Sequence, residues 1–261
     1  MIITLELVQI LWIISHPFIL EKEDMQKIKS IIFFSVMVIS AILFSIPAIL
    51  TFPFPYKKRY AFISQWARFN IWSLGKICGL TYVVKGVENI PTEPSIILSK
   101  HQSTWETFAL QLIFPPQIWV LKKALLRVPF FGWALAMLEP IAINRAARKK
   151  AMEQILEQGK LRLDNNRWVV LFPEGTRIAP GKRGKYKLGG ARLAEHTKRL
   201  VVPVAHNAGE YWPKHSITKK AGVITLSVLP TIDPNGKSAA EIGQLVETSI
   251  ENEMKIITTI S

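Results

Sequence analysis

The sequence predicts one α/β domain with a mixed, largely parallel sheet flanked by helices, preceded by an apolar helical membrane anchor. Residues 30–56 carry no charged side chain, whereas short β-rich runs alternate with helical runs after residue 80. Near-continuous apolar strands such as residues 168–172 indicate a sheet that is buried on both faces. We expect an N-terminal extension over 1–24, a membrane anchor with an interfacial helix over 25–79, and the α/β domain over 80–261.

Composition narrows the function classes. The chain has 261 residues, a mean hydropathy of +0.22 and a net charge of +14. Residues 142–220 hold 18 Lys and Arg against 6 Asp and Glu, which favours an anionic partner: nucleic acid, an acidic membrane surface or a phosphorylated substrate. Cys78 stands alone, so a disulfide framework and a cysteine-based zinc site within the chain are excluded.

The anchor is predicted from 22 uncharged residues, 31–52. A helix of that length spans about 33 Å, enough for a hydrocarbon core of about 30 Å. Pro47 predicts a kink, and Pro53 with Pro55 ends the helix. Lysines flank the segment on both sides, so the distribution of positive charge does not favour one orientation, and a re-entrant hairpin fits as well as a true crossing. A buried core helix is the remaining alternative. Residues 1–24 lack the features of a signal peptide, and Met25 would serve as a start.

An aromatic stripe follows the anchor. Phe62, Trp66, Phe69 and Trp72 lie on nearly one face of a helix predicted over 60–80. Such a stripe is typical of an interfacial helix at a membrane, and a core helix explains it equally well.

The remaining elements follow from the local pattern. Strands are predicted over residues 81–85, 95–99, 118–121, 140–143, 168–172, 200–205 and 223–229. Helices are predicted over residues 104–114, 127–138, 145–163, 186–196 and 239–256. Internal repeats are absent from the sequence.

A polar block, Lys-His-Gln-Ser-Thr-Trp-Glu, follows the predicted strand 95–99 as residues 100–106. Strand ends in α/β sheets are where reactive groups gather, and His101 is suited to act as a general base near neutral pH. On a regular helix Glu106 would point about 140° away from His101, so they can meet only across a non-helical turn. Glu106 is also explained as the acid of a capping box that starts at Ser103.

A second block, Phe-Pro-Glu-Gly-Thr-Arg, follows the predicted strand 168–172. Gly175 lets the backbone approach a ligand closely, and Thr176 with Arg177 offers donors suited to phosphate. Glu174 would order Arg177 or bind a substrate hydroxyl. The alternative is an ordinary turn with a surface arginine. HExxH, GxSxG, P-loop and GxGxxG motifs are absent.

Both blocks together, with Val202-Pro203 further on, resemble the glycerolipid acyltransferase family. Within it they resemble the bacterial 1-acylglycerol-3-phosphate (lysophosphatidic acid) acyltransferases, over roughly half of the chain. The resemblance implies transfer of an acyl chain from acyl-CoA or acyl carrier protein to the free sn-2 hydroxyl of lysophosphatidic acid. The product would be phosphatidic acid, for phospholipid biosynthesis at the cytoplasmic face of the bacterial inner membrane, without a cofactor or a metal.

The resemblance also implies residue roles. His101 would be the base and Glu106 its orienting acid, while backbone N–H groups after His101 would hold the oxyanion. Glu174, Gly175, Thr176 and Arg177 would bind the acceptor, and Arg145 matches the arginine block of the family. The sequence departs from the family where Glu106 replaces the usual Asp, where Glu139-Pro140 replaces a glycine before the arginine block, and where Ile178 replaces a Ser.

Other functions remain as alternatives. One is a different lysolipid acceptor, such as a lyso-ornithine lipid, which would need Arg177 less. Another is a membrane-binding protein without catalysis, against which the pair His101 and Glu106 argues. Nucleic-acid binding rests on the net charge alone, and we expect no nucleic-acid partner.

Overall fold

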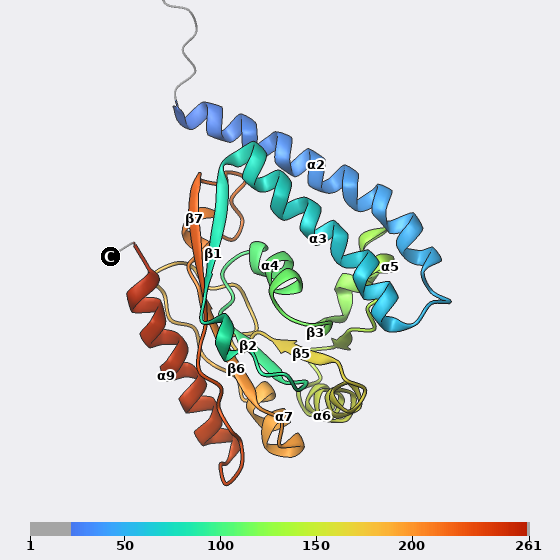
Figure 1. The fold of residues 1–261 in the computed structure, drawn as a ribbon, viewed down its shortest axis with the longest axis vertical. Coiled ribbons are helices and arrows are strands. Elements are labelled where there is room, and N and C mark those ends of the chain that lie inside the picture. The colour runs from blue at the N-terminus through green and yellow to red at the C-terminus, as the bar shows by residue number, and fades with distance from the viewer. Residues whose placement is uncertain (1–21, 260–261) are drawn as a thin grey trace, which may run out of the picture.

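Seven strands form one sheet in the order β1-β7-β6-β2-β5-β3-β4 (Figure 1). Every neighbouring pair is parallel except β6 with β7, which confirms the mixed, largely parallel sheet. This computed structural model describes residues 22–259, so most of the predicted extension over 1–24 lies outside the described residues. The strands are β1 (Leu80–Lys85), β2 (Ile96–Ser99), β3 (Gln117–Lys122), β4 (Ile141–Ile143), β5 (Trp168–Leu171), β6 (Val201–His206) and β7 (Gly222–Val228).

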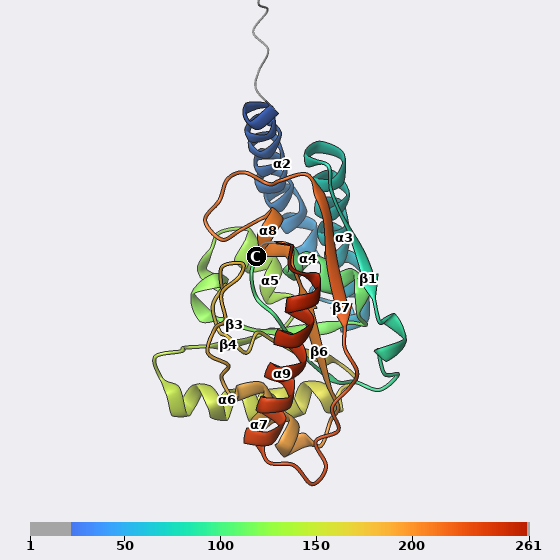
Figure 2. The same cartoon turned by 90° about the vertical axis from the view of Figure 1, so that its left-hand side faces the viewer.

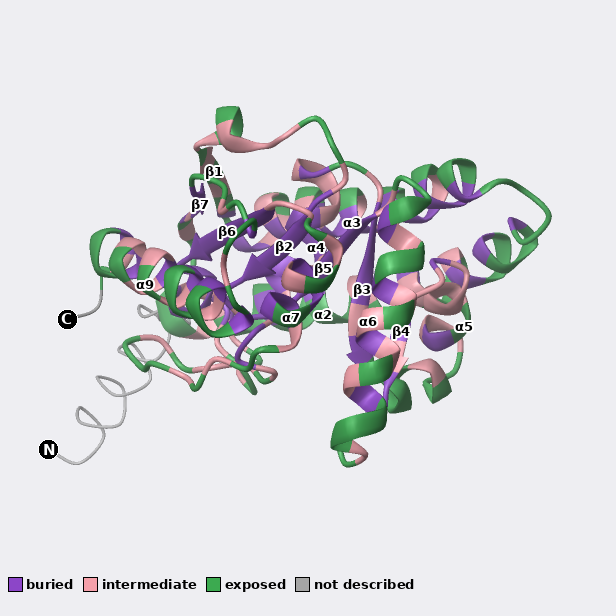
Figure 3. Cartoon of the chain, turned by 90° about the horizontal axis from the view of Figure 1, so that it is seen from below, coloured by how far each residue is buried: buried purple, intermediate pink, exposed green. Residues whose placement is uncertain are grey.

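Helices cover both faces of the sheet (Figure 1, Figure 2). On one side lie α2 (Lys22–Leu50), α3 (Tyr56–Cys78), α4 (Trp105–Ile113) and α5 (Phe131–Ala136); on the other lie α6 (Arg148–Asp164), α7 (Gly189–Thr197) and α9 (Ala239–Ile257). Figure 3 shows the central strands as the most buried part of the fold. Every residue of β2 and β5 is buried, as their apolar sequences predict for a sheet covered on both faces.

The long helix α2 does not project away from the domain. It lies alongside α3 and also contacts α5. Near its start, Gln26 Nε2 donates to the carbonyl oxygens of Cys78 and Lys219. Pro47 lies within α2, and α3 begins directly after Pro55.

The aromatic stripe of α3 faces inward for most of its length. Phe62 packs on Phe44 of α2 with ring centroids 5.7 Å apart, and Trp66 packs on Phe108 of α4 at 5.2 Å. Trp72 alone of the four stripe residues is exposed. The stripe therefore joins α2 to the domain.

Some boundaries differ from the sequence pattern for local reasons. Of the helix predicted over 127–138 only the short α5 forms, because Pro129 and the positive φ of Phe130 (61°) separate it from the preceding 3-10 turn, Lys123–Arg127. The helix predicted from 145 begins at Arg148, because Asn144 holds a turn by accepting from the N–H of Ala146. The short helix α8 (Ala208–Tyr211) was not predicted.

Candidate active site

The two polar blocks meet at one edge of the sheet because their strands are neighbours. β2 pairs with β5 in parallel, so the residues that follow both strands leave the sheet at the same edge. The N–H of Ile178 donates to the carbonyl oxygen of His101 at 2.8 Å and joins the two loops directly. Residues 101 and 178, which are 77 positions apart in sequence, are thus held in one site.

His101 and Glu106 contact each other across the non-helical turn that precedes α4. His101 Nδ1 lies 2.8 Å from Glu106 Oε1, and the carboxylate is fully buried whereas the imidazole reaches the surface of a cavity. The carboxylate can only accept, so Nδ1 carries the proton and Nε2 is left as the basic nitrogen. The ring of Phe172 stacks on the imidazole at 3.9 Å and 12°, which fixes the plane of the ring.

Glu106 serves the turn as well as the histidine. Its Oε1 accepts from the N–H groups of Gln102 and Ser103, both at 2.9 Å. Burial opposes its charge, but His206, the His101 ring and the Ser103 N–H outweigh burial and hold the pKa of Glu106 below its usual range. The capping box predicted from Ser103 to Glu106 is not formed, because α4 is capped at Thr104 without a side-chain bond and Ser103 Oγ accepts from the N–H of Trp105 rather than of Glu106. Glu106 keeps only the half of that motif in which its carboxylate accepts from the Ser103 N–H, and it orients His101.

The backbone donors after His101 are already engaged. The N–H groups of Gln102 and Ser103 donate to Glu106, and the N–H of Trp105 donates to Ser103 Oγ at 3.2 Å. The oxyanion role expected for the helix start thus does not fall to these three groups while the turn is intact. Arg177 Nη1 donates to Thr104 Oγ1 at 3.0 Å, so the Thr104 hydroxyl keeps its own proton for a ligand in the cavity.

A cationic cluster surrounds the turn after β5. Arg145 Nη1 donates to the carbonyl oxygen of Gly175, which has a φ of 67°, and Arg145 and Arg177 both line the cavity. The positive φ is what favours glycine at position 175, and a Cβ there would lie 2.6 Å from Lys187 Nζ, which shows that the end of this lysine side chain lies over the turn. Lys214 Nζ lies 3.5 Å from the exposed Thr176 Oγ1. The sequence assigned the two arginines to the acceptor site but did not place Lys187 or Lys214 there, because spacing does not reveal which lysines fold back onto the turn.

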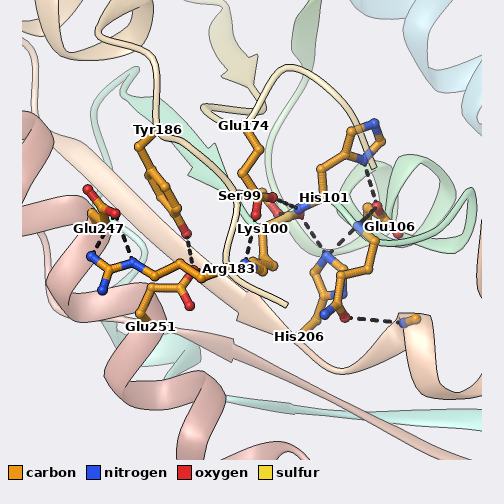
Figure 4. A network of polar contacts seen from close by, with 12 residues as sticks. Ser99, Lys100, His101, Glu106, Glu174, Arg183, Tyr186, His206, Glu247 and Glu251 are labelled. Carbon is orange, nitrogen blue, oxygen red and sulfur yellow. Dashed lines mark hydrogen bonds and ion pairs between the residues drawn. The ribbon is translucent and has the colours of Figure 1, made fainter. Parts of the chain in front are cut away.

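Glu174 points away from this cluster. Its carboxylate is buried, and Oε1 lies 2.7 Å from Lys100 Nζ while Oε2 accepts from the N–H of His101 at 2.9 Å (Figure 4). Glu174 is not among the residues that line the cavity, and Arg177 is not its partner. Burial raises the pKa of Glu174, and the ammonium of Lys100 opposes that shift. The sequence placed Lys100 beside His101 without indicating this role.

A cavity of about 320 Å³ opens beside His101. Its polar lining includes Thr104, Arg145 and Arg177, and most of its wall is apolar. The helix pair supplies part of that wall through Phe44 of α2 and Trp66 of α3. Further apolar lining comes from Phe108, Trp119, Leu121, Leu125, Phe131, Leu135, Leu138 and Phe172. Such a cavity suits an amphipathic ligand with an anionic end and a hydrocarbon part.

Within residues 22–259, no group of three or more His, Cys, Asp or Glu side chains is placed to hold a metal ion. The single helix long and apolar enough to span a membrane in that same range is α2.

Comparison with known proteins supports the site. The acyltransferase family profile matches residues 81–207, which contain both polar blocks. A 1-acyl-sn-glycerol-3-phosphate acyltransferase of Pseudomonas aeruginosa is 44% identical over 90% of this chain and 93% of its own length. The protein of the same name in Saccharomyces cerevisiae is 31% identical over 71% of this chain and 63% of its own length.

The fold has a solved counterpart. The crystal structure of the 1-acyl-sn-glycerophosphate (LPA) acyltransferase PlsC from Thermotoga maritima matches with a TM-score of 0.75 and 22% identity. The match covers 90% of this chain and 96% of that one, so the helix pair and the α/β domain belong to one shared fold. With the identity and coverage of the Pseudomonas relative, this shows that the chain belongs to the acyltransferase family.

Proposed function

We propose that this enzyme transfers an acyl chain from an acyl thioester to the free sn-2 hydroxyl of 1-acylglycerol-3-phosphate, giving phosphatidic acid. The observation that carries the proposal is the position of His101 at the cavity, with its Nδ1 held by buried Glu106 and two arginines in the same lining. The relatives at 44% and 31% identity bear the name of this activity.

The chemistry is a direct transfer. His101 Nε2 takes the proton of the acceptor hydroxyl as its oxygen attacks the thioester carbonyl. Glu106 stabilises the imidazolium that forms. When the tetrahedral intermediate collapses, the carbon–sulfur bond breaks and the thiolate takes the proton from the imidazolium. Atoms and charges balance without a cofactor.

A covalent acyl-enzyme is not needed for this route. The thiol of Cys78 is buried between α3 and α2, contacts the carbonyl oxygen of Lys29, and does not line the cavity. Burial raises the pKa of Cys78, which disfavours the nucleophilic thiolate. Ser103 is buried and accepts from the Trp105 N–H, so it is engaged in the turn.

The cationic cluster favours a phosphorylated acceptor over a lyso-ornithine lipid. Arg145, Arg177, Lys187 and Lys214 surround one turn, and this concentration of positive charge suits a phosphate monoester. The apolar wall of the cavity would take hydrocarbon from the acceptor or the donor.

For location we propose the cytoplasmic membrane of a bacterium, with the site at the cytoplasmic face, where the acyl thioester is available. Residues on the outer side of α2 support membrane contact: Ile39, Leu43 and Ile46 are 57%, 65% and 57% exposed. Because the opposite side of α2 packs on α3 and α5, an in-plane position in one leaflet fits better than an isolated crossing.

The test is release of free thiol by the purified protein. We expect release from acyl-CoA or acyl carrier protein only when lysophosphatidic acid is present, with phosphatidic acid as the lipid product. His101→Ala should abolish release and leave the melting temperature unchanged. A membrane-binding protein without catalysis would release no thiol with any acceptor. Faster release with lyso-ornithine lipid than with lysophosphatidic acid would show that the acceptor is not phosphorylated. Comparing the two donors at equal concentration identifies the preferred one.

A further inference from the structure

The peptide unit that joins Lys100 to His101 is held at both polar ends (Figure 4). His206 Nε2 donates to the carbonyl oxygen of Lys100 at 2.8 Å, and the N–H of His101 donates to Glu174 Oε2 at 2.9 Å. The His206 ring is itself held in place, because its Nδ1 accepts from the N–H of Ala208. The backbone that carries His101 cannot rotate unless one of these bonds breaks.

Lys100 holds Glu174, the acceptor of the His101 N–H, in place. Its side chain is 1% exposed, and Nζ lies 2.7 Å from Glu174 Oε1 and 2.8 Å from Glu251 Oε1. Burying an ammonium this deeply is costly unless it finds hydrogen-bond acceptors or an ionic partner, and Lys100 has two carboxylates. Without it, the buried Glu174 carboxylate would lose its ionic partner and would be held less firmly beside the His101 N–H.

Glu251 extends the chain of contacts to α9. Tyr186 Oη donates to Glu251 Oε1 at 2.8 Å. Burial and the carboxylates of Glu251 and Glu174 raise the pKa of Tyr186, so the phenol keeps its proton and remains a donor. α9 starts with a complete capping box at Ser238 and packs on α7 and β6, which makes it a firm support.

Resting on His101 as the base of the proposed function, we infer that Lys100 is a positioning residue for acyl transfer. It acts through Glu174 on the backbone of His101, and Glu251 fixes it to α9. Lys100 and Glu251 touch neither the cavity nor the reacting atoms, so they are not catalytic residues. Their contribution is to keep His101 Nε2 aligned with the acceptor hydroxyl.

The chain offers a matched control for Lys100. Lys219 is also 1% exposed, and its Nζ donates to the carbonyl oxygen of Ile217 at 2.8 Å and lies 5.0 Å from the Trp212 ring. We expect Lys100→Met and Lys219→Met both to lower the melting temperature. In detergent micelles, Lys100→Met should lower kcat of the folded protein by about a hundredfold with little change in either KM, because small misalignments carry such losses. Lys219→Met should keep the wild-type kcat. Equal loss of kcat in both variants, or full kcat in folded Lys100→Met protein, overturns the inference.

Glu251 gives a milder test that keeps the Lys100–Glu174 pair. Glu251→Gln retains an acceptor for Lys100 and Tyr186, whereas Glu251→Leu retains none. We expect kcat to fall in the order wild type, Gln, Leu. Ile250→Val, a fully buried neighbour on α9, should lower the melting temperature and leave kcat unchanged. If Glu251→Leu also changes only the melting temperature, α9 contributes to stability but does not position His101.

His101→Ala separates failure of this inference from failure of the proposed function. If His101→Ala retains turnover, the base assignment itself is wrong. If His101→Ala is inactive while Lys100→Met and Glu251→Leu keep full kcat, the function stands and only the positioning role is lost.

Discussion

Glu106 Oε1 lies 2.8 Å from His101 Nδ1 and also accepts from the backbone N–H groups of Gln102 and Ser103. One oxygen therefore fixes both the turn and the tautomer of the base. Glu106→Gln separates these tasks, because the amide oxygen can still accept from the two N–H groups. With that oxygen at the Oε1 position the contact to the His101 Nδ1–H also remains, but the negative charge that stabilises the imidazolium is lost.

We therefore predict that Glu106→Gln lowers kcat by about a thousandfold or more with only a modest fall in melting temperature, since a neutral amide cannot stabilise the imidazolium by charge. Steady-state kinetics and thermal unfolding of the same preparation check this. Glu106→Asp should keep partial activity, because a carboxylate remains. An unstable but active Glu106→Gln protein would mean that the residue only caps the helix.

A second prediction concerns acid stability. The pKa of Glu106 lies below its ordinary value of 4.5, so folding favours the ionised carboxylate. Its contribution is complete above pH 4.5 and is lost as the pH falls through the lower folded-state pKa. The pKa of Glu174 is shifted in the opposite direction, but Glu174 is present in both proteins, so its effect on stability cancels in the comparison. The difference in free energy of unfolding between wild type and Glu106→Gln should stay constant from neutral pH down to pH 4.5 and shrink as the pH falls further. A constant difference would contradict the ionic role.

A third prediction concerns the acceptor phosphate. Arg177→Ala should raise KM for lysophosphatidic acid about ten- to a hundredfold, because a charge-assisted bond to phosphate is lost, and should change KM for the acyl donor little. Arg183→Ala is the matched control, because Arg183 pairs with Glu247 at 2.7 Å and lies outside the cavity. Equal effects of Arg177→Ala on both substrates would argue against a phosphate contact.

The sequence predicted all seven strands, since short apolar runs between turn residues leave little choice of structure. It also predicted that His101 and Glu106 could meet only across a non-helical turn, which is the geometry observed. Periodicity could not show that Glu174 points inward to Lys100, because both partners lie in loops and the contact is set by the pairing of β2 with β5. The same holds for Lys187, whose ammonium folds back over Gly175.

The last prediction concerns the outer side of α2. Residues 41, 44, 45 and 48 line the cavity, whereas Ile39, Leu43 and Ile46 are exposed on the same helix. Replacing these three by Asn removes apolar surface worth about 1.5–3 kcal/mol for each fully buried side chain. We expect the triple variant to be released from phospholipid vesicles in a sedimentation assay and to keep its kcat in detergent micelles. The matched control replaces Leu161 of α6 and Ile256 of α9, which are 54% and 75% exposed, and should remain bound. Membrane binding that survives the triple change would place the lipid contact elsewhere on the protein.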